Sequence, residues 1–206
     1  MKVKLVLLLL ASALLCACAS RNESGQGTRA NANGPGQNVN PNVNQSANTG
    51  EQKAKMRLSS SAFRNEGTIP KAYTCDGANV SPPLAWEDVP EKARSLALIA
   101  DDPDAPAKTW VHWVVFNLLA TMKGLPENVP AQGMIAGRGV QGTNDFRKVG
   151  YGGPCPPVGT HRYFFKLYAL DTELALDSST TKDALLKAME GHILAEGQLM
   201  GKYSRQ

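Results

Sequence analysis

Prolines placed between β-rich runs are the feature that most constrains how this chain folds. They occur at Pro82-Pro83, within 103–106 and within 154–157, each time near a stretch of β-branched and aromatic residues. Proline has no amide hydrogen to donate and its ring clashes inside a helix, so no long helix can cross these positions. The sequence therefore predicts a mainly β domain whose turns are stiffened by proline.

The strands are predicted from runs of apolar, β-branched or aromatic residues. Ser95 to Asp101 is a short apolar run that ends in acids, as a buried strand does where it emerges at a sheet edge. Three further runs have the composition of strands: 55–63, 110–119 and 161–170.

Only the C-terminal part of the sequence has a helical pattern. Apolar residues at helical spacing predict a helix from Asp183 to Met189, with one of the residues 179–181 (Ser-Thr-Thr) as its N-cap. Gly191 interrupts the pattern, and the helix is expected to continue from Ile193 to Met200.

Residues 1–17 are predicted to be an export signal. Two lysines precede an apolar stretch from Leu5 to Leu15 that is too short to span a bilayer. The following Leu15-Cys16-Ala17-Cys18 resembles the lipobox of a bacterial lipoprotein, with Cys18 as the first mature residue. Acyl groups such as palmitate on Cys18 would hold the protein on a membrane without a spanning helix. With Ala19 next, we expect a bacterial cell-envelope protein, anchored in the outer membrane and facing the periplasm; an ordinary secretory signal is the alternative.

Residues 18–53 are predicted to be a disordered tether. Asn, Gly, Gln, Ser and Pro dominate, aromatic residues are absent, and only Val39 and Val43 are large apolar residues. Such a segment buries too little surface to offset the entropy of ordering it. As a flexible coil it would span about 30 Å on average.

Residues 54–206 are long enough for one domain with a core of its own. The chain has a formal net charge of +4, which falls to +2 once Lys2 and Lys4 leave with the signal. Because there is no basic run and no interleaved aromatic stripe, the sequence gives no support to nucleic-acid binding.

Two segments of this domain carry the groups of a small binding site. The first is 101–113, DDPDAPAKTWVHW, and the second is 151–163, YGGPCPPVGTHRY. Each joins a proline-stiffened turn to a β-rich run that carries one histidine. Together they supply carboxylates, imidazoles, aromatic faces and backbone amides, which are the parts of an anion pocket.

The carboxylates of the first segment are predicted to orient an imidazole. Asp102 and Asp104 flank Pro103, which restricts the turn that presents them. A carboxylate is a poor direct ligand for an anion, but it can accept a hydrogen bond from a histidine and direct the other ring nitrogen to the ligand. Asp102 is favoured for this role and Asp104 as a turn cap, while Arg162 is expected to pair with a carboxylate as a structural contact.

The two histidines have different settings in the sequence. If side chains alternate along 110–119, His112 shares a face with Trp110, whereas Val111 and Trp113 share the other. A lone histidine in such a position would be a core residue. His161 opens its strand directly after a loop, which is a typical position for a functional residue.

The glycine–proline loop is expected to complete the pocket. Gly152 and Gly153 have no Cβ, so their amides are expected to approach the ligand. Tyr151 and Tyr163 can supply hydroxyls, although Tyr163 also has the spacing of a core residue.

The patterns DPDAP…WxHW and GPxPPxGxHRY resemble the two defining motifs of the phosphatidylethanolamine-binding protein family, in its bacterial Raf-kinase-inhibitor-like branch. The resemblance covers residues 56–206 and implies a central sheet packed against a second sheet, with short peripheral helices. Eukaryotic members have a histidine doublet after the tryptophan, whereas this chain has Val111-His112, so the resemblance does not imply the identity of the ligand. It does not imply a kinase partner either, since the domain is expected to face the cell envelope. The family pocket, which binds phosphate, carboxylate or phospholipid head groups, corresponds here to Asp102, Pro106, Trp110, His112, Gly153, Pro157, His161 and Tyr163.

Cys75 and Cys155 are the only cysteines in residues 54–206. In an oxidising compartment two such cysteines usually pair, and the bridge would contribute about 4 to 5 kcal/mol in the chain-entropy model. Proteins resembling this one also carry both cysteines in cytosolic forms, where no bridge is expected. The sequence leaves the bridged and the reduced state open.

These features predict a membrane-anchored binding protein with a small anion pocket, no catalysis and no cofactor. A Cys–His hydrolase built on Cys155, His161 and Asp102 is one alternative, but an oxidising compartment disfavours a free thiolate and no Gly-x-Ser-x-Gly is present. A metal site of Asp102, His112 and His161 has suitable ligand types but no close pair such as His-x-x-x-His. A protein-interaction role, such as inhibiting a protease or modulating signalling, is a further alternative, for which the sequence identifies no partner.

Overall fold

The computed structural model describes residues 54–135 and 139–205. The predicted signal, Cys18 and the tether lie outside these residues. Within them no helix is long and apolar enough to cross a membrane. The described elements in chain order are β1 (Ala54–Lys55), β2 (Arg57–Ser59), the 3-10 helix η1 (Lys71–Tyr73), β3 (Leu84–Glu87), β4 (Ser95–Asp102), β5 (Trp110–Leu119), β6 (Gly124–Leu125), β7 (Val140–Gln141), β8 (Thr160–Leu170), α1 (Lys182–Met189) and β9 (Ile193–Ser204).

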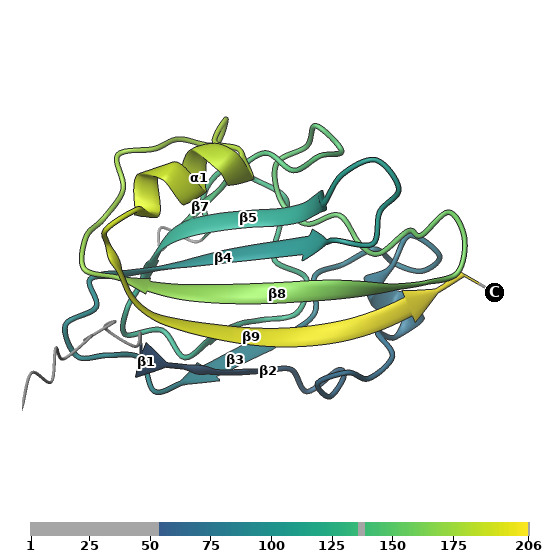
Figure 1. Ribbon diagram of the computed structural model, residues 1–206, viewed down its shortest axis with the longest axis horizontal. Coiled ribbons are helices and arrows are strands. Elements are labelled where there is room, and N and C mark those ends of the chain that lie inside the picture. The colour runs from purple at the N-terminus through teal and green to yellow at the C-terminus, as the bar shows by residue number, and fades with distance from the viewer. Residues whose placement is uncertain (1–53, 136–138, 206) are drawn as a thin grey trace, which may run out of the picture. The chain divides into compact units, whose positions relative to one another are not determined.

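The strands form two sheets, as the family resemblance implied, and the strand predicted over 55–63 is replaced by the two short strands β1 and β2. The central sheet has the order β1-β9-β8-β4-β5-β7, and the second sheet has the order β2-β3-β6. All pairs are antiparallel except β1 with β9. Figure 1 shows the long strands β8 and β9 across the front, with β2 and β3 in the layer behind them.

Each face of the central sheet is packed by a different layer. One face meets the second sheet through a large apolar cluster that includes Trp86 of β3, Leu98 of β4 and Leu167 of β8. The other face is covered in part by α1, whose Leu185 and Met189 are fully buried. Because β4 lies between β5 and β8 and is covered on both faces, all its residues are buried, which explains its continuous apolar sequence.

The C-terminal helix is shorter than the sequence suggested. Thr181 is its N-cap, as expected, and accepts a hydrogen bond from the amide of Ala184. The helix ends at Met189, and Gly191 follows with a φ of 79°, which favours glycine. The prediction that the helix continues from Ile193 to Met200 is wrong, because this segment begins β9, which pairs with β8 along its length.

β5 carries a bulge at His112. Ala100 of β4 pairs with Trp113, whereas Asp101 pairs with Val111, so His112 is an extra residue between the two pairs. The expected alternation is therefore wrong for Val111 and Trp113, which lie in the two different apolar clusters. Because the bulge turns the side chain of His112 away from the helix-covered face, it places the imidazole with Trp110 at the cavity described below.

The carboxylates of Asp101 and Asp102, the last two residues of β4, point to opposite faces of the sheet. Asp101 is fully buried and accepts hydrogen bonds from Lys166 of β8 and from Lys182 in the first turn of α1. This contact ties the helix to the sheet. Asp102 points the other way, as strand alternation requires, toward the cavity.

Candidate functional site

A cavity of about 250 Å³ lies at the end of the central sheet where β4 ends and β5 and β8 begin. It brings together side chains from both motifs and from one further loop. Its lining residues are Asp102, Ala105, Pro106, Trp110, His112, Phe146, Cys155, Pro157 and His161. Of the eight residues predicted for the ligand site, Gly153 and Tyr163 are the two that do not line this cavity.

Asp102 and His161 form the polar centre of the cavity. His161 Nδ1 lies 2.7 Å from Asp102 Oδ2, and the two side chains are 8% and 5% exposed. The second carboxylate oxygen, Oδ1, accepts the amide of Asp104 at 2.8 Å, which fixes the plane of the carboxylate. A carboxylate only accepts, so the hydrogen is on Nδ1 and the ring directs Nε2 away from Asp102. This is the contact that the sequence predicted for Asp102.

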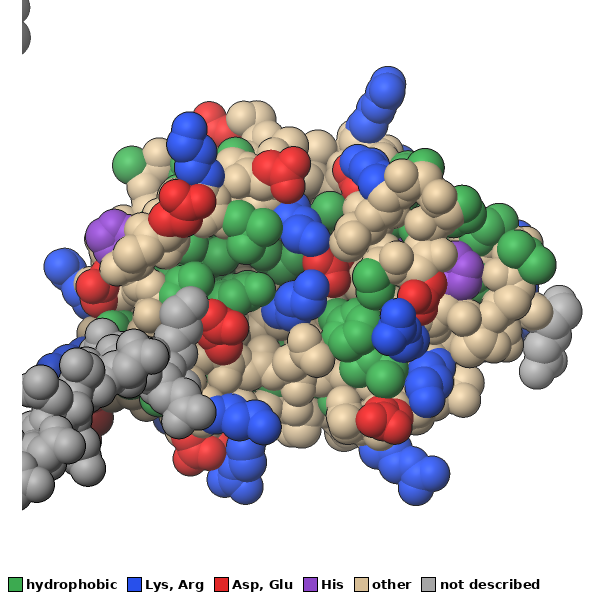
Figure 2. Space-filling view, in the orientation of Figure 1, with side chains coloured by type: hydrophobic (Ala, Val, Ile, Leu, Met, Phe, Trp, Pro, Cys, Tyr) green, Lys and Arg blue, Asp and Glu red, His purple; other side chains and the backbone are tan. Residues whose placement is uncertain are grey.

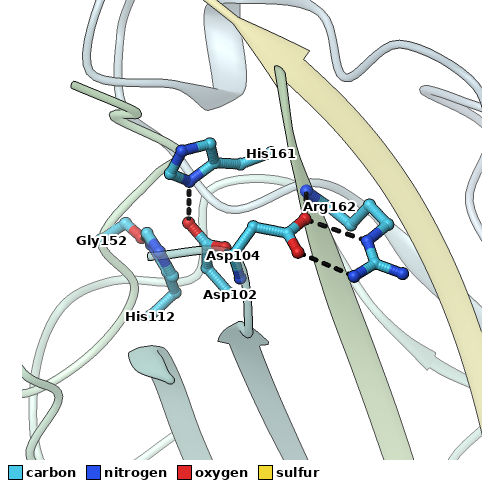
Figure 3. Close-up of polar contacts among 6 residues, drawn as sticks. All are labelled: Asp102, Asp104, His112, Gly152, His161 and Arg162. Carbon is cyan, nitrogen blue, oxygen red and sulfur yellow. Dashed lines mark hydrogen bonds and ion pairs between the residues drawn. The ribbon is translucent and has the colours of Figure 1, made fainter. Parts of the chain in front are cut away.

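Asp104 and Arg162 brace the turn that holds Asp102. Arg162 donates from Nη2 to Asp104 Oδ1 at 2.7 Å and from Nε and its own amide to Oδ2 at 2.9 Å (Figure 3). These hydrogen bonds from Arg162 lower the pKa of Asp104 to about 2. Arg162 was expected to pair with a carboxylate on the opposite sheet face; its partner is a carboxylate, but one in the turn after β4, and the pair binds this turn to the start of β8.

His112 is held by the backbone rather than by a carboxylate. Its Nδ1 lies 2.6 Å from the carbonyl oxygen of Gly152, and the residue is only 4% exposed. Because the carbonyl accepts, Nδ1 carries the hydrogen in the neutral ring and Nε2 is an acceptor. Burial lowers the pKa of His112, which favours this neutral form. The two imidazoles of the cavity therefore have different partners, a backbone carbonyl for His112 and a carboxylate for His161.

Tyr163 lies between the two imidazoles, beneath the cavity. Its ring centroid is 5.2 Å from that of His112 and 6.5 Å from that of His161. The residue is 2% exposed, and its hydroxyl has no hydrogen-bond partner within the described part of the chain. Burial and the nearby charge of Asp102 raise the pKa of this hydroxyl, so it stays protonated. It is a buried hydroxyl close to the Asp102 carboxylate, and it does not itself line the cavity.

The glycine amides are not available to a ligand. The amide of Gly152 donates to the carbonyl of His112 at 2.9 Å, and that of Gly153 donates to Asn79 Oδ1 at 2.7 Å. The prediction that these amides approach a ligand is therefore wrong. Glycine is needed there for close packing instead, because a Cβ on Gly153 would lie 2.5 Å from the carbonyl oxygen of Tyr73.

A disulfide joins Cys75 and Cys155, which the sequence had left open. It ties the turn after η1 to the loop that precedes β8. The amide of Cys75 also donates to the carbonyl of Pro154 at 3.0 Å, beside the bridge. Since Cys155 lines the cavity, the disulfide is part of its wall and the sulfur is not a thiolate in this form.

Phe146 is the cavity residue that lies outside both sequence motifs, and sequence reasoning missed it. Its ring centroid is 5.4 Å from those of Trp110 and His112, both met edge-on. It belongs to a turn in which Asn144 Oδ1 accepts the amides of Phe146 and Lys148. An Asn-Asp pair indicates such a turn, but nothing in the sequence indicates that the turn packs against β5.

The described residues contain no group of three or more His, Cys, Asp or Glu side chains arranged to hold a metal ion. The alternative of a metal bound by Asp102, His112 and His161 therefore finds no geometric support in this part of the chain.

The structure places this chain in a class of β domains that have two packed sheets and a histidine-lined cavity at the end of the central sheet. The protein-family model described as phosphatidylethanolamine-binding protein matches residues 59–204 of this chain. The chain belongs to this family.

Relatives of known sequence or structure extend over the same domain. A UPF0098 protein of Methanothermobacter thermautotrophicus is 57% identical over 150 residues, which make up 73% of this chain and 99% of the relative. The crystal structure of a putative phosphatidylethanolamine-binding protein homologue from Chlamydia trachomatis is 44% identical with a TM-score of 0.68, covering 74% of this chain and 99% of that one. E. coli YbcL, described as a new member of the mammalian PEBP family, is 32% identical with a TM-score of 0.70, covering 74% and 100%.

Proposed function

We propose that this chain is a non-catalytic binding protein whose cavity takes a small anionic group, a phosphate or a carboxylate, either free or as part of a phospholipid head group. The observation that carries the proposal is the hydrogen bond from His161 to Asp102 at the edge of the cavity. In its charged form the ring donates from both nitrogens, one to Asp102 and one to the ligand.

The remaining groups of the cavity support the same ligand chemistry. Tyr163 lies beside both imidazoles, and its hydroxyl, which has no hydrogen-bond partner in the described residues, would be a second donor to a ligand that reaches past the cavity lining. Asp104, the other carboxylate of the turn, is neutralised by Arg162 and does not repel an anion. At about 250 Å³ the cavity is smaller than the pockets of about 300 to 1,000 Å³ that bind drug-sized molecules, so it suits one small charged group.

Isothermal titration tests the proposal. The protein used is residues 54–206, since a relative consists almost entirely of this domain. Phosphate, phosphoethanolamine and acetate are titrated into the wild type, His161→Ala and the control His192→Ala. The His192 side chain is 45% exposed and pairs with Asp171, outside the cavity. We expect binding at millimolar ligand that His161→Ala abolishes and His192→Ala leaves unchanged. No heat from any of the three ligands with the wild type sinks the proposal.

The absence of catalysis is part of the proposal and has its own test. A Cys–His hydrolase needs a thiolate at Cys155, and this sulfur is bonded to Cys75. We expect Cys155 to resist thiol-specific alkylation until a reductant is added. Alkylation of Cys155 in the untreated protein would show that its thiol is free, and the hydrolase alternative would then stand again.

The proposal includes an acyl anchor at Cys18 that holds the domain at the bacterial cell envelope. The lipobox-like Leu15-Cys16-Ala17-Cys18 after an apolar stretch supports it. In cells fed labelled palmitate, the wild type should carry label and sediment with membranes, whereas Cys18→Ala should lose the label. An unlabelled wild type in the soluble fraction would contradict the anchor.

A further inference from the structure

Large apolar side chains are exposed at few places in the described residues, and two of them stand beside the mouth of the cavity. Phe146 is 37% exposed and Val158 is 76% exposed. The other two such residues lie elsewhere, Leu119 at the end of β5 and Met134 next to β7. The apolar side chains at the cavity mouth therefore form a local feature rather than a property of the whole surface.

Three loops present these side chains together, and we call their exposed parts the collar. The collar consists of 105–110, 146–148 and 156–159. Pro106, Trp110, Phe146 and Pro157 line the cavity from above, and Val158 extends beyond Pro157. Gly159, with a φ of 73°, makes the turn that projects Val158 into solvent. Figure 2 shows hydrophobic side chains gathered around a histidine at the end of the domain where β8 begins.

Positive charge surrounds the apolar part of the collar. Lys108 lies 5.7 Å from the Trp110 ring and pairs with Asp145. Arg147 and Lys148 are exposed, and their side chains have no partner among the described residues. The nearby carboxylates are already engaged, Asp145 with Lys108 and Asp104 with Arg162. The collar is therefore an apolar ring with unpaired cations at its edge.

We propose that the collar docks on the surface of an anionic phospholipid bilayer. Aromatic and aliphatic side chains flanked by Lys and Arg are the composition that binds the interface of such a bilayer. The unpaired cations face anionic head groups, while Phe146 and Val158 enter the boundary between head groups and acyl chains. The inference depends on the proposed envelope anchor only for the presence of a bilayer, and the collar itself acts through the folded domain.

The length of the tether permits this orientation. The described chain begins at Ala54, level with Ala195 of β9, whereas His161 is level with Tyr203 near the other end of that strand. β9 has 12 residues and is about 40 Å long. Fully extended, residues 18–53 would span about 120 to 130 Å, so an anchor at Cys18 does not prevent the collar from meeting the membrane.

Sedimentation with lipid vesicles tests the inference on residues 54–206, which carry no acyl group. One set of vesicles is pure phosphatidylcholine and the other contains phosphatidylglycerol. We expect binding to the anionic vesicles that weakens as salt is raised. Each cation removed in Arg147→Gln and Lys148→Gln should weaken partitioning about fivefold, and Val158→Ser should weaken it about tenfold by removing buried apolar surface.

The controls separate the collar from general surface effects and from the cavity. Leu119→Ser and Lys123→Gln remove an exposed apolar side chain and an exposed cation elsewhere, and vesicle binding should not change. Val158, Arg147 and Lys148 do not line the cavity, so phosphate titration should be unaffected in their variants. Absence of binding to anionic vesicles overturns the inference, and so does equal binding by the collar variants and the wild type. Phosphate binding that persists in either case leaves the proposed function standing.

Discussion

The buried hydroxyl of Tyr163 offers a sharp test, because its removal should change the stability of the protein and its affinity for phosphate in opposite directions. Tyr163→Phe removes an oxygen that is buried without a partner in the described chain. Leaving a buried hydroxyl unpaired costs about 1 to 3 kcal/mol. We therefore expect the ligand-free variant to be more stable by about this amount. For a domain of this length the melting temperature should rise by roughly 2 to 4 °C per kcal/mol.

Affinity should change in the other direction. A hydrogen bond to a charged group contributes about 1.5 to 3 kcal/mol, so loss of the hydroxyl should weaken phosphate binding about tenfold to a hundredfold. Tyr203→Phe is the matched control, because the Tyr203 hydroxyl donates to Asp76 Oδ2 at 2.8 Å, away from the cavity. It should lower stability by about 1 kcal/mol and leave binding unchanged.

Thermal unfolding and isothermal titration of both variants decide the matter. If Tyr163→Phe is destabilised as Tyr203→Phe is, the Tyr163 hydroxyl has a partner and the reasoning is refuted. If stability rises but phosphate affinity is unchanged, the hydroxyl is unpaired but does not contact the ligand.

Three further perturbations follow from the contacts. Arg162 lowers the pKa of Asp104 from 3.8 to about 2, so the pair stabilises the fold above about pH 4, and this contribution is lost as pH falls toward 2. Asp104→Asn should lower stability at neutral pH by about 1 kcal/mol, reduced by the exposure of Arg162. In urea unfolding, the difference in free energy of unfolding between the wild type and Asp104→Asn should disappear between pH 4 and 2. A difference that stays constant over this range would contradict the prediction. Burial lowers the pKa of His112 from 6.5, so nitrogen NMR should show a neutral ring with hydrogen on Nδ1 below that pH. Stability should fall with acid there, because the unfolded chain takes up the proton; a ring that titrates at or above 6.5 would be inconsistent. Cys75 and Cys155 close a loop with a sequence separation of 80. Replacing both by Ser should lower the free energy of unfolding by about 4 to 5 kcal/mol. Equal stability would show that the bridge does not form.

The sequence located β4 and β5 because burial on both faces makes their apolar runs nearly continuous, whereas β8, whose residues alternate in burial, was located by its aromatic and apolar composition. β4, β5 and β8 begin and end within one residue of the predicted runs. β9 was missed because Leu194, Leu199 and Met200 are spaced as in a helix and glycines interrupt the strand pattern. Glycine is required at Gly197 by close packing against a residue far away in the sequence, because a Cβ there would lie 2.7 Å from the carbonyl oxygen of Met56.

The Asp102–His161 contact could be foreseen for a local reason. A proline turn fixes the carboxylate and a loop-to-strand junction fixes the imidazole, so both positions depend on nearby residues. The contribution of Phe146 could not be foreseen, because it depends on a loop packing against a strand edge. The glycine amides were misassigned since absence of a Cβ permits close approach without saying what approaches.

The extra residue in β5 also limits which changes of length this family member can tolerate. Trp113 is fixed in the core. In a regular strand His112 would then point toward α1, and Trp110 would turn with it. Removing Val111 or His112 to straighten the ladder would thus take the imidazole away from the cavity while most of the sheet kept its pairing. Such a deletion should yield a folded protein whose cavity lacks one imidazole, whereas a similar deletion in an exposed loop need not.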